Sequence, residues 1–141
     1  PNLNGIKFTS NNFMEMIECI RFDDGRFDIL NGFDEMLLCG MAVGARGGVG
    51  STYNYSLRTY QKIYNAFMAG DLEQARAAQQ ESVDIVHVII NHGGGIRGGK
   101  AIMKLIGIDC GDCRLPLAPY TEAEIARLDE ELRAIGFKGF E

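Results

Sequence analysis

A lysine and several polar side chains follow short apolar runs, and their types suit covalent chemistry on a carbonyl group. Lys7 lies near the end of the run 5–8, and Thr9 comes directly after it. Strand side chains alternate, so Ile6 and Phe8 face one side of a strand and Lys7 faces the other. A lysine that is partly removed from water can lose its proton and attack a ketone as a free amine. The open alternative is a salt-bridged or solvent-facing lysine.

Two later runs end in groups of a similar kind. The second run ends at Gly32, and Asp34 and Glu35 follow at once, whereas the third, glycine-rich run (47–52) contains Ser51. Two adjacent carboxylates can act as a general acid and base. They can equally be a solvated pair that the helix dipole favours in a first turn. Their place beside a glycine at a strand end supports binding of substrate hydroxyl groups.

The spacing of these runs predicts a repeat of strand and helix. Strands are expected at 5–8, 27–32 and 47–52, about every twenty residues, and each is followed by a helical pattern. Such units give parallel strands whose carboxyl ends share one face, which is where barrels of this kind place their chemistry. The sequence therefore predicts that the side chains named above meet at one active-site face.

The remainder is predicted to be helical. A long helix is expected from Asp71 to about His92, a shorter one over 98–106, and a last one after a capping box formed by Thr121 and Glu124. This divides the chain into strand–helix units over 1–70 and a helical region over 71–141. The side chains expected to face inward are Phe13, Met16, Ile17, Ile20, Leu57, Tyr60, Ile63, Tyr64, Phe67, Ile125, Leu128, Leu132 and Ile135.

Composition narrows the class of protein. The 141 residues, 46% of them hydrophobic, suffice for one domain with a real core. A net charge of −5 disfavours nucleic acid and anionic membranes as partners, and no apolar run approaches a membrane span. Cys19 and Cys39 sit in helical apolar patterns, which suits reduced thiols in a cytoplasmic protein. Because the chain begins at Pro1, almost within a strand, we expect a piece of something longer.

Several further patterns match cofactor or metal sites only in part. The segment 94–100 resembles a phosphate-binding loop, but Ala101 replaces the required Ser or Thr and a helix precedes it. Gly48 and Gly50 match only part of a dinucleotide fingerprint. Cys110-x-x-Cys113 has no second pair, so half a zinc site and a redox pair both stay open. His87 and His92 are five apart on one predicted helix, which favours packed or surface histidines over metal ligands.

Three segments together resemble the N-acetylneuraminate lyase (sialic acid aldolase) family of the dihydrodipicolinate synthase superfamily. They are Gly5-Ile6-Lys7-Phe8-Thr9-Ser10, Asn31-Gly32-Phe33-Asp34-Glu35 and Gly47-Gly48-Val49-Gly50-Ser51-Thr52-Tyr53-Asn54. The later segments 100–103 and 114–117 are similar to its carboxyl-terminal helical region. The resemblance covers essentially the whole chain in order and spacing, and the second and third segments point to the sialic acid branch.

The resemblance implies a fold and an activity. The fold is α/β, the C-terminal part of a (β/α)8 barrel with about three parallel strands plus C-terminal helices, and complete barrels take about 250 residues. Lys7 would form the Schiff base, without metal or organic cofactor, in cleavage of N-acetylneuraminate to N-acetylmannosamine and pyruvate. The implied substrate-binding residues are Thr9, Gly32, Asp34, Glu35 and Ser51.

The same resemblance implies that part of the site is elsewhere. The family's carboxylate-binding loop and its proton-transferring tyrosine have no counterpart in this sequence. We therefore expect a fragment that is inactive without the missing N-terminal half, and that half or a second copy of the chain as its partner in a homo-oligomer. The alternatives are another pyruvate-dependent lyase or synthase of the superfamily, and a non-catalytic, self-associating half-barrel.

Overall fold

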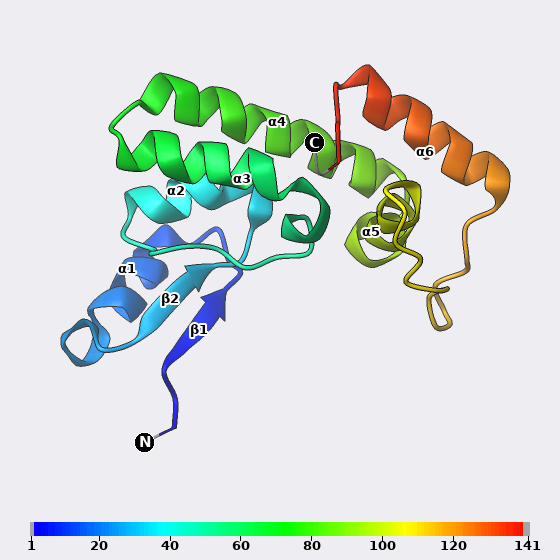
Figure 1. The fold of residues 1–141 in the computed structure, drawn as a ribbon. Coiled ribbons are helices and arrows are strands. Elements are labelled where there is room, and N and C mark those ends of the chain that lie inside the picture. Colours follow the sequence, from blue (N-terminus) through cyan, green and yellow to red (C-terminus); the bar gives the residue numbers. More distant parts are fainter. Residues whose placement is uncertain (1, 140–141) are drawn as a thin grey trace.

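The structure is a computed structural model that describes residues 2–139, and a strand-and-helix part lies beside a helical part (Figure 1). The elements, in chain order, are β1 (Gly5–Phe8), α1 (Phe13–Arg21), the 3-10 helix η1 (Phe22–Gly25), β2 (Asp28–Asn31), the 3-10 helix η2 (Asp34–Met36), α2 (Leu37–Ala42), α3 (Tyr53–Met68), α4 (Leu72–Asn91), α5 (Gly94–Leu105) and α6 (Glu122–Ala134). The alternation of strand and helix holds up to residue 42, and everything after residue 53 is helix or loop.

Two short parallel strands, β1 and β2, pair along their whole length. The segment 47–52, predicted as a third strand, pairs with β2 only through a bridge between Asn31 and Gly48. Its two hydrogen bonds run from Asn31 N to Gly47 O and from Val49 N to Asn31 O, both 2.9 Å. The prediction of a full third strand is therefore wrong, because glycine offers no side chain to pack on a sheet face.

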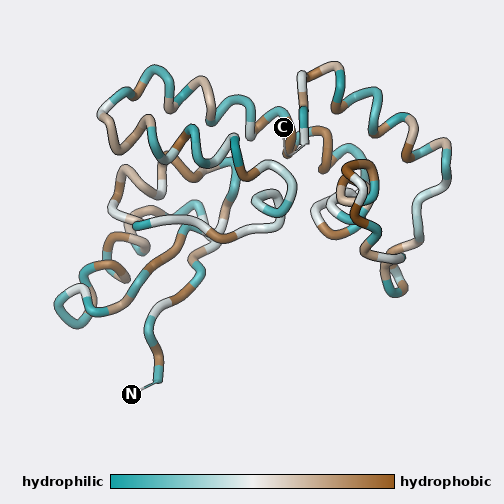
Figure 2. The backbone as a smooth tube through the Cα atoms, in the orientation of Figure 1, coloured by the Kyte–Doolittle hydropathy of each residue, from teal (hydrophilic) through white to brown (hydrophobic). Residues whose placement is uncertain are grey.

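Apolar side chains form three clusters that follow the chain from the strands to the last helix. The first contains Met16, Ile29 and Ala45; the second contains Leu37, Met41, Tyr60, Ile63 and Ala78; the third contains Tyr55, Ile85, Val88, Ile89, Ala101, Ile102, Leu128 and Leu132. Helices α3 and α4 run side by side through the middle of the molecule, and hydrophobic and hydrophilic residues alternate along both (Figures 1 and 2). The second and third clusters draw on both helices, so the core crosses residue 70; the division at that residue stays a prediction.

The helix ends follow their capping residues. Asn12 caps α1 and Asp71 caps α4 through the backbone N–H of Gln74 at 2.9 Å. The predicted capping box at Thr121 and Glu124 is confirmed. The predicted start of α5 at residue 98 is wrong, because only Gly93 and Gly94, with φ of 91° and 88°, are needed for the turn after α4, and α5 begins at Gly94.

Four of the side chains predicted to face inward are exposed: Ile17, Leu57, Tyr64 and Ile135. The predicted histidine pair divides, since His87 is exposed whereas the buried side chain of His92 lies 3.0 Å from Glu131 through its Nε2. The four cysteines are free thiols, and Cys19 and Cys39 are only half-buried. Within residues 2–139 no helix is both long and apolar enough to cross a membrane.

Candidate active site

The carboxyl ends of β1 and β2 and the loop before α3 open into one pocket of about 290 Å³. The residues singled out from the sequence all line it: Lys7, Thr9, Gly32, Asp34, Glu35 and Ser51. Parallel pairing brings the first two segments together, because Gly32 N donates to Phe8 O at 2.8 Å just beyond the strands. The bridge at Gly48 brings the third segment beside them. One amine, two carboxyl groups and two hydroxyl groups thus share one concave surface.

Gly32 makes room for the lysine. A Cβ at this position would fall 2.9 Å from Lys7 Cε and 2.0 Å from Thr9 Oγ1, so no larger residue fits without moving both side chains. The lysine chain therefore runs directly across the backbone of the second strand end, beside the threonine hydroxyl. Lys7 itself is exposed and faces the pocket mouth rather than a packed interior.

Asp34 is held by the residues that start α3. Its Oδ2 accepts hydrogen bonds from Thr52 N at 3.0 Å and from Thr52 Oγ1 at 2.5 Å. The oxygen of Thr52 also lies 2.5 Å from the hydroxyl of Tyr60, which is eight residues further along the chain, in α3. All three side chains are buried. The carboxylate is thus fixed in place by a chain of hydrogen bonds that ends in the second apolar cluster.

The direction of these hydrogen bonds follows from the number of protons that the side chains can donate. Thr52 has one hydroxyl proton and donates it in the hydrogen bond to the Asp34 carboxylate. Tyr60 must therefore donate to the threonine oxygen. Burial, and to a smaller degree the negative charge of Asp34, raises the pKa of the Tyr60 phenol above its ordinary value, which keeps that proton in place. Tyr53, whose ring stacks on that of Tyr60 at a centroid distance of 4.0 Å, has its pKa raised by the same two causes.

The other carboxylate oxygen of Asp34 is enclosed by the third segment. A Cβ at Gly50 would fall 1.6 Å from Asp34 Oδ1, so glycine is required there. Among the described residues, Oδ1 is buried and has no hydrogen-bond partner. A buried, unpaired carboxylate oxygen is costly, and such atoms concentrate at functional sites. Ser51, which is next to Gly50 and exposed, and the half-buried Glu35 are more accessible from the pocket than Asp34 is.

The helical region supplies the opposite wall. Val86, Ile89 and Ile90 of α4 line the pocket together with Gly95 at the start of α5. This wall is apolar where the strand ends are polar, as ligand pockets commonly are. Within residues 2–139, no group of three or more His, Cys, Asp or Glu side chains is placed to hold a metal ion.

Comparison with known proteins gives the family of this chain. The family model described as "Dihydrodipicolinate synthetase family" matches residues 1–135. The chain belongs to the dihydrodipicolinate synthetase family. Relatives of this family member include the N-acetylneuraminate lyase of Gallus gallus, which is 37% identical over 137 residues, or 96% of this chain and 44% of the relative.

Solved structures from the same family agree with the sequence comparison. The N-acetylneuraminate lyase of Proteus mirabilis superposes with a TM-score of 0.91 at 37% identity, over 98% of this chain and 46% of that one. The Fusobacterium nucleatum enzyme, solved in complex with pyruvate, superposes with a TM-score of 0.83 at 29% identity, over 94% and 44%. The chain thus spans less than half the length of these relatives. Its neighbours are lyases of this barrel superfamily, and the two parallel strands fit part of such a barrel.

Sequence reasoning missed three residues that hold Asp34 in place, of which Thr52 also lines the pocket. Thr52 lies inside the third resembling segment, and the hydrogen-bonding potential of its hydroxyl was the available signal. Tyr60 was assigned to the core, where it does lie, but without its polar role. Gln79 of α4 donates to Asp34 O at 3.4 Å and accepts from Leu38 N at 2.8 Å, and no local pattern indicates this contact.

Proposed function

We propose that this chain carries the covalent lysine and the substrate-hydroxyl subsite of a class I aldolase that cleaves N-acetylneuraminate to N-acetylmannosamine and pyruvate. The observation that carries the proposal is the convergence of Lys7, Thr9 and Gly32 with Asp34, Glu35 and Ser51 on one pocket. Family membership and similarity to proteins named N-acetylneuraminate lyase give the reaction class. The proposal concerns the complete enzyme, of which this chain would form one part.

The proposed reaction begins with the Lys7 amine. It attacks the C2 ketone of the open-chain sugar acid, and loss of water gives an iminium. The electron pair of the C3–C4 bond then moves to the iminium nitrogen, while the C4 hydroxyl gives its proton to a base and becomes the aldehyde of N-acetylmannosamine. The resulting enamine takes a proton at C3, and water releases pyruvate and the free lysine. No metal or organic cofactor enters this scheme, because the iminium nitrogen is the electron sink.

The surrounding residues position the reactants in this scheme. Gly32 lets the lysine lie across the strand end, and Thr9 stands beside its Cε. Ser51 and Glu35 contact the polyol hydroxyl groups, and Asp34, held by Thr52, fixes the loop that presents Ser51. Effective alignment of this kind is a large part of enzymatic rate enhancement. The apolar wall from α4 covers the opposite side of the substrate.

The outer edge of β1 offers a place for a partner strand. Among residues 2–139, β1 pairs with β2 alone, so its other edge has free backbone groups. Leu3 and Ile6 beside that edge are 57% and 41% exposed. Unpaired edges with apolar neighbours favour association. We propose that a further strand, from the remainder of the barrel or from a second copy of the chain, pairs here. The isolated chain should therefore form a dimer or a larger assembly, and a single-chain mass by light scattering would contradict that self-association.

Experiment can separate the aldolase proposal from two alternative functions. The family model alone covers synthases as well as lyases, so condensation of pyruvate with an aldehyde such as aspartate semialdehyde is the competing activity. A non-catalytic, self-associating half-barrel is the other. An activity comparison separates the three possibilities, because each predicts a different substrate pair or none.

The test uses the chain alone and mixed with the remaining part of a relative such as the Gallus gallus enzyme. The expected result is pyruvate release from N-acetylneuraminate in the mixture, little or none from the chain alone, and none with Lys7→Ala. Condensation with aspartate semialdehyde, without cleavage of the sugar acid, would move the assignment to a synthase. A well-folded mixture that does neither would leave the half-barrel scaffold. Circular dichroism of each sample confirms folding.

A further inference from the structure

A second cavity, of about 550 Å³, lies between α3, α4 and the segment that follows α6. It shares no lining residue with the pocket around Lys7. One wall carries Ser56, Thr59 and Lys62 from α3, and the facing wall carries Glu81 and Ile85 from α4. Neither the aldolase proposal nor the packing of the core accounts for a hollow of this size at this place.

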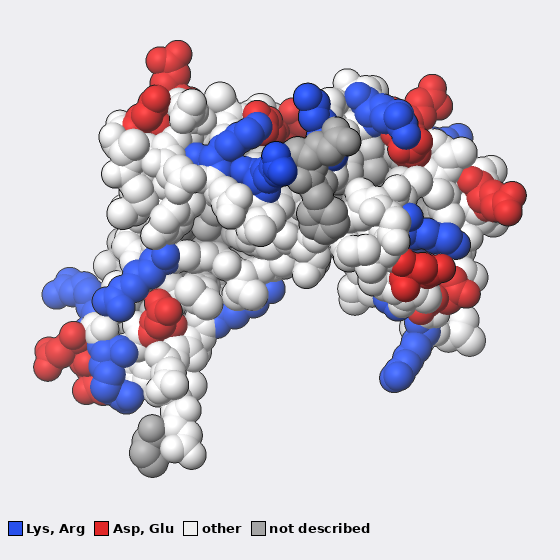
Figure 3. Space-filling model, in the orientation of Figure 1, with Lys and Arg blue, Asp and Glu red and all other residues white. Residues whose placement is uncertain are grey.

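The cavity is lined by positive charge in an acidic protein. Arg58, Lys62 and Lys138 line it, and among residues 2–139 Glu81 is the one acidic side chain in its lining. Lys62 Nζ lies 2.9 Å from Glu81 Oε2, so one cation is partly neutralised and two are left, whereas the whole chain carries −5. Figure 3 shows Lys and Arg side chains gathered on the face of the molecule over α3. Such a concentration of cations raises the local concentration of anions.

A buried hydroxyl on the same wall points to a ligand independently of the charge. Ser56 is 2% exposed, and within the described residues its Oγ has no hydrogen-bond partner. Ser56 also interrupts α3, with φ −130° and ψ 29°, so the helix is kinked where it borders the cavity. A buried hydroxyl without a partner costs free energy unless something supplies the missing hydrogen bond.

The remaining lining is apolar. Ile85 is buried, and Ile135 and Phe137 of the segment after α6 close the cavity from the other side. A small inorganic ion would leave these side chains without contact. An anion with an apolar body satisfies both the cations and the apolar wall.

From these features we infer that the cavity binds an organic phosphate monoester, with the phosphate group on Arg58, Lys138 and Ser56 and its apolar body against Ile85 and Phe137. A phosphate dianion suits the two remaining cations better than a carboxylate does, since each of its oxygens accepts charge-assisted hydrogen bonds. The inference stands apart from the aldolase proposal, because it uses none of the residues around Lys7.

The test is calorimetric titration of the purified chain with three probes: phenyl phosphate, inorganic phosphate and benzoate. Phenyl phosphate should bind most tightly, inorganic phosphate more weakly for lack of apolar contact, and benzoate more weakly for lack of charge. Arg58→Gln combined with Lys138→Gln should weaken phenyl phosphate at least tenfold, since hydrogen bonds to charged groups contribute on that scale. The matched control is Arg76→Gln, an exposed cation of α4 outside the cavity.

Two further variants give effects of opposite sign. Glu81→Gln should strengthen binding severalfold, because it releases Lys62 and removes a negative charge from the cavity wall. Ser56→Ala should weaken binding yet leave the ligand-free chain as stable or more stable, since it deletes an unpaired buried hydroxyl. No binding of phenyl phosphate, equal affinity for benzoate, or equal loss in Arg76→Gln would overturn the inference. So would an unchanged affinity in the double variant.

Discussion

Apolar side chains are less completely buried at the strand end of this molecule than at its helical end. In the helical end, Ile102 and Leu128 are fully buried within a cluster to which α3, α4, α5 and α6 all contribute. At the strand end, Ile6 is 41% exposed and Phe22 is 66% exposed, and β1 has one paired edge among the described residues. The candidate chemistry lies at the open end, whereas the larger share of the fully enclosed core lies at the other.

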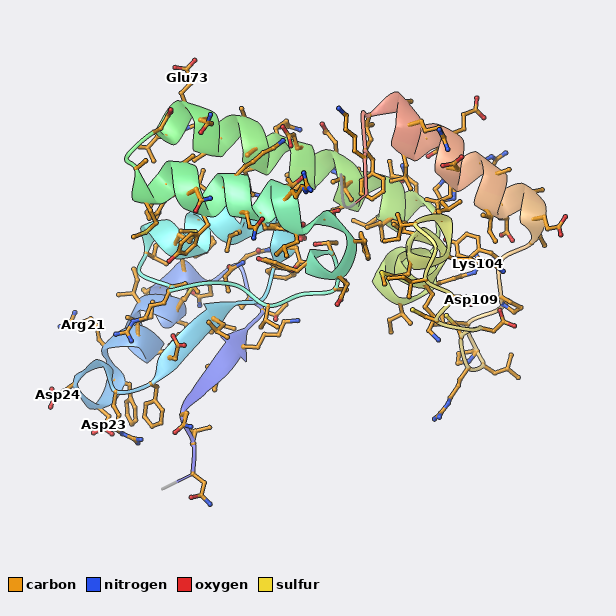
Figure 4. The ribbon with its side chains drawn as sticks, viewed as in Figure 1. Arg21, Asp23, Asp24, Glu73, Lys104 and Asp109 are labelled. Carbon is orange, nitrogen blue, oxygen red and sulfur yellow. The ribbon has the colours of Figure 1, made fainter. Side chains whose placement is uncertain are left out.

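This contrast indicates that the helical end contributes most of the stability, whereas the strand end carries the candidate catalytic lysine. Burial of apolar side chains is the dominant favourable term in folding, so the helical end should dominate the stability of the chain. The strand end positions Lys7 but is covered less well, and it should depend on whatever pairs with β1. Figure 4 shows how far apart the two ends lie: Arg21 at the end of α1 and Asp23 and Asp24 of η1 project far from Lys104 and Asp109 at the helical end.

The largest expected effect comes from breaking the helical core. Leu128→Ala should lower the free energy of unfolding by about 2–5 kcal/mol, as deletions of fully buried leucine side chains do. The matched change at the strand end, Ile6→Ala, should alter it by less than about 0.5 kcal/mol in a single chain, because Ile6 is already exposed. Urea unfolding followed by circular dichroism measures both. Similar losses in the two variants would contradict the proposed division.

An intermediate effect is expected where the two ends are joined at Thr52. Thr52→Val keeps the side-chain shape but removes the hydroxyl that links Asp34 to Tyr60, so stability should fall by about 1–3 kcal/mol. Tyr60→Phe should cost about 0.5–1.5 kcal/mol, because only the terminal hydrogen bond is lost. A double-mutant cycle should show that the two losses are not additive. Full additivity would mean that the chain of hydrogen bonds does not act as a unit.

The smallest expected effect lies at the capping box of α6. Hydrogen bonds from the backbone of Thr121 and from the side chains of Arg97 and Thr121 lower the pKa of Glu124 to about 2. Because the folded-state pKa is lowered, this stabilisation is fully present above the unfolded value of about 4.3 and is lost as pH falls toward and through about 2. Glu124→Gln should therefore be slightly less stable at pH 7 and equal to the parent chain near pH 2. Thermal melts across that range give the comparison, and a pH-independent difference would refute it.

Local patterns predicted much of this molecule. The capping box at Thr121 and the helix cap at Asp71 depend on neighbours within three residues, so the sequence alone indicates them. The strand that carries Lys7 was indicated by its local alternation, although it pairs with the distant β2. The meeting of the three segments at one face also followed, because parallel strands share the direction of their carboxyl ends. The roles assigned to the residues of that face stay predictions.

Contacts between distant elements could not be predicted in this way. The wall formed by Val86, Ile89 and Ile90 depends on how α4 packs, and a helical pattern does not specify which element it will face. Ile17 and Leu57 are exposed for a related reason: spacing identifies the apolar stripe of a helix but not how much of it is covered. The predicted third strand is only a single bridge in the structure, because its glycines permit an extended backbone without stabilising one.

The central claim is that Lys7 bonds covalently to a 2-oxo acid, and borohydride reduction in the presence of pyruvate tests it most directly. The chain is mixed with the complementary part of a family relative, reduced, and measured by intact mass and peptide mapping. The account predicts one reduced pyruvate imine per chain, located on Lys7 and absent in Lys7→Ala. A folded mixture without this adduct, or the same adduct in the Lys7→Ala variant, would contradict it.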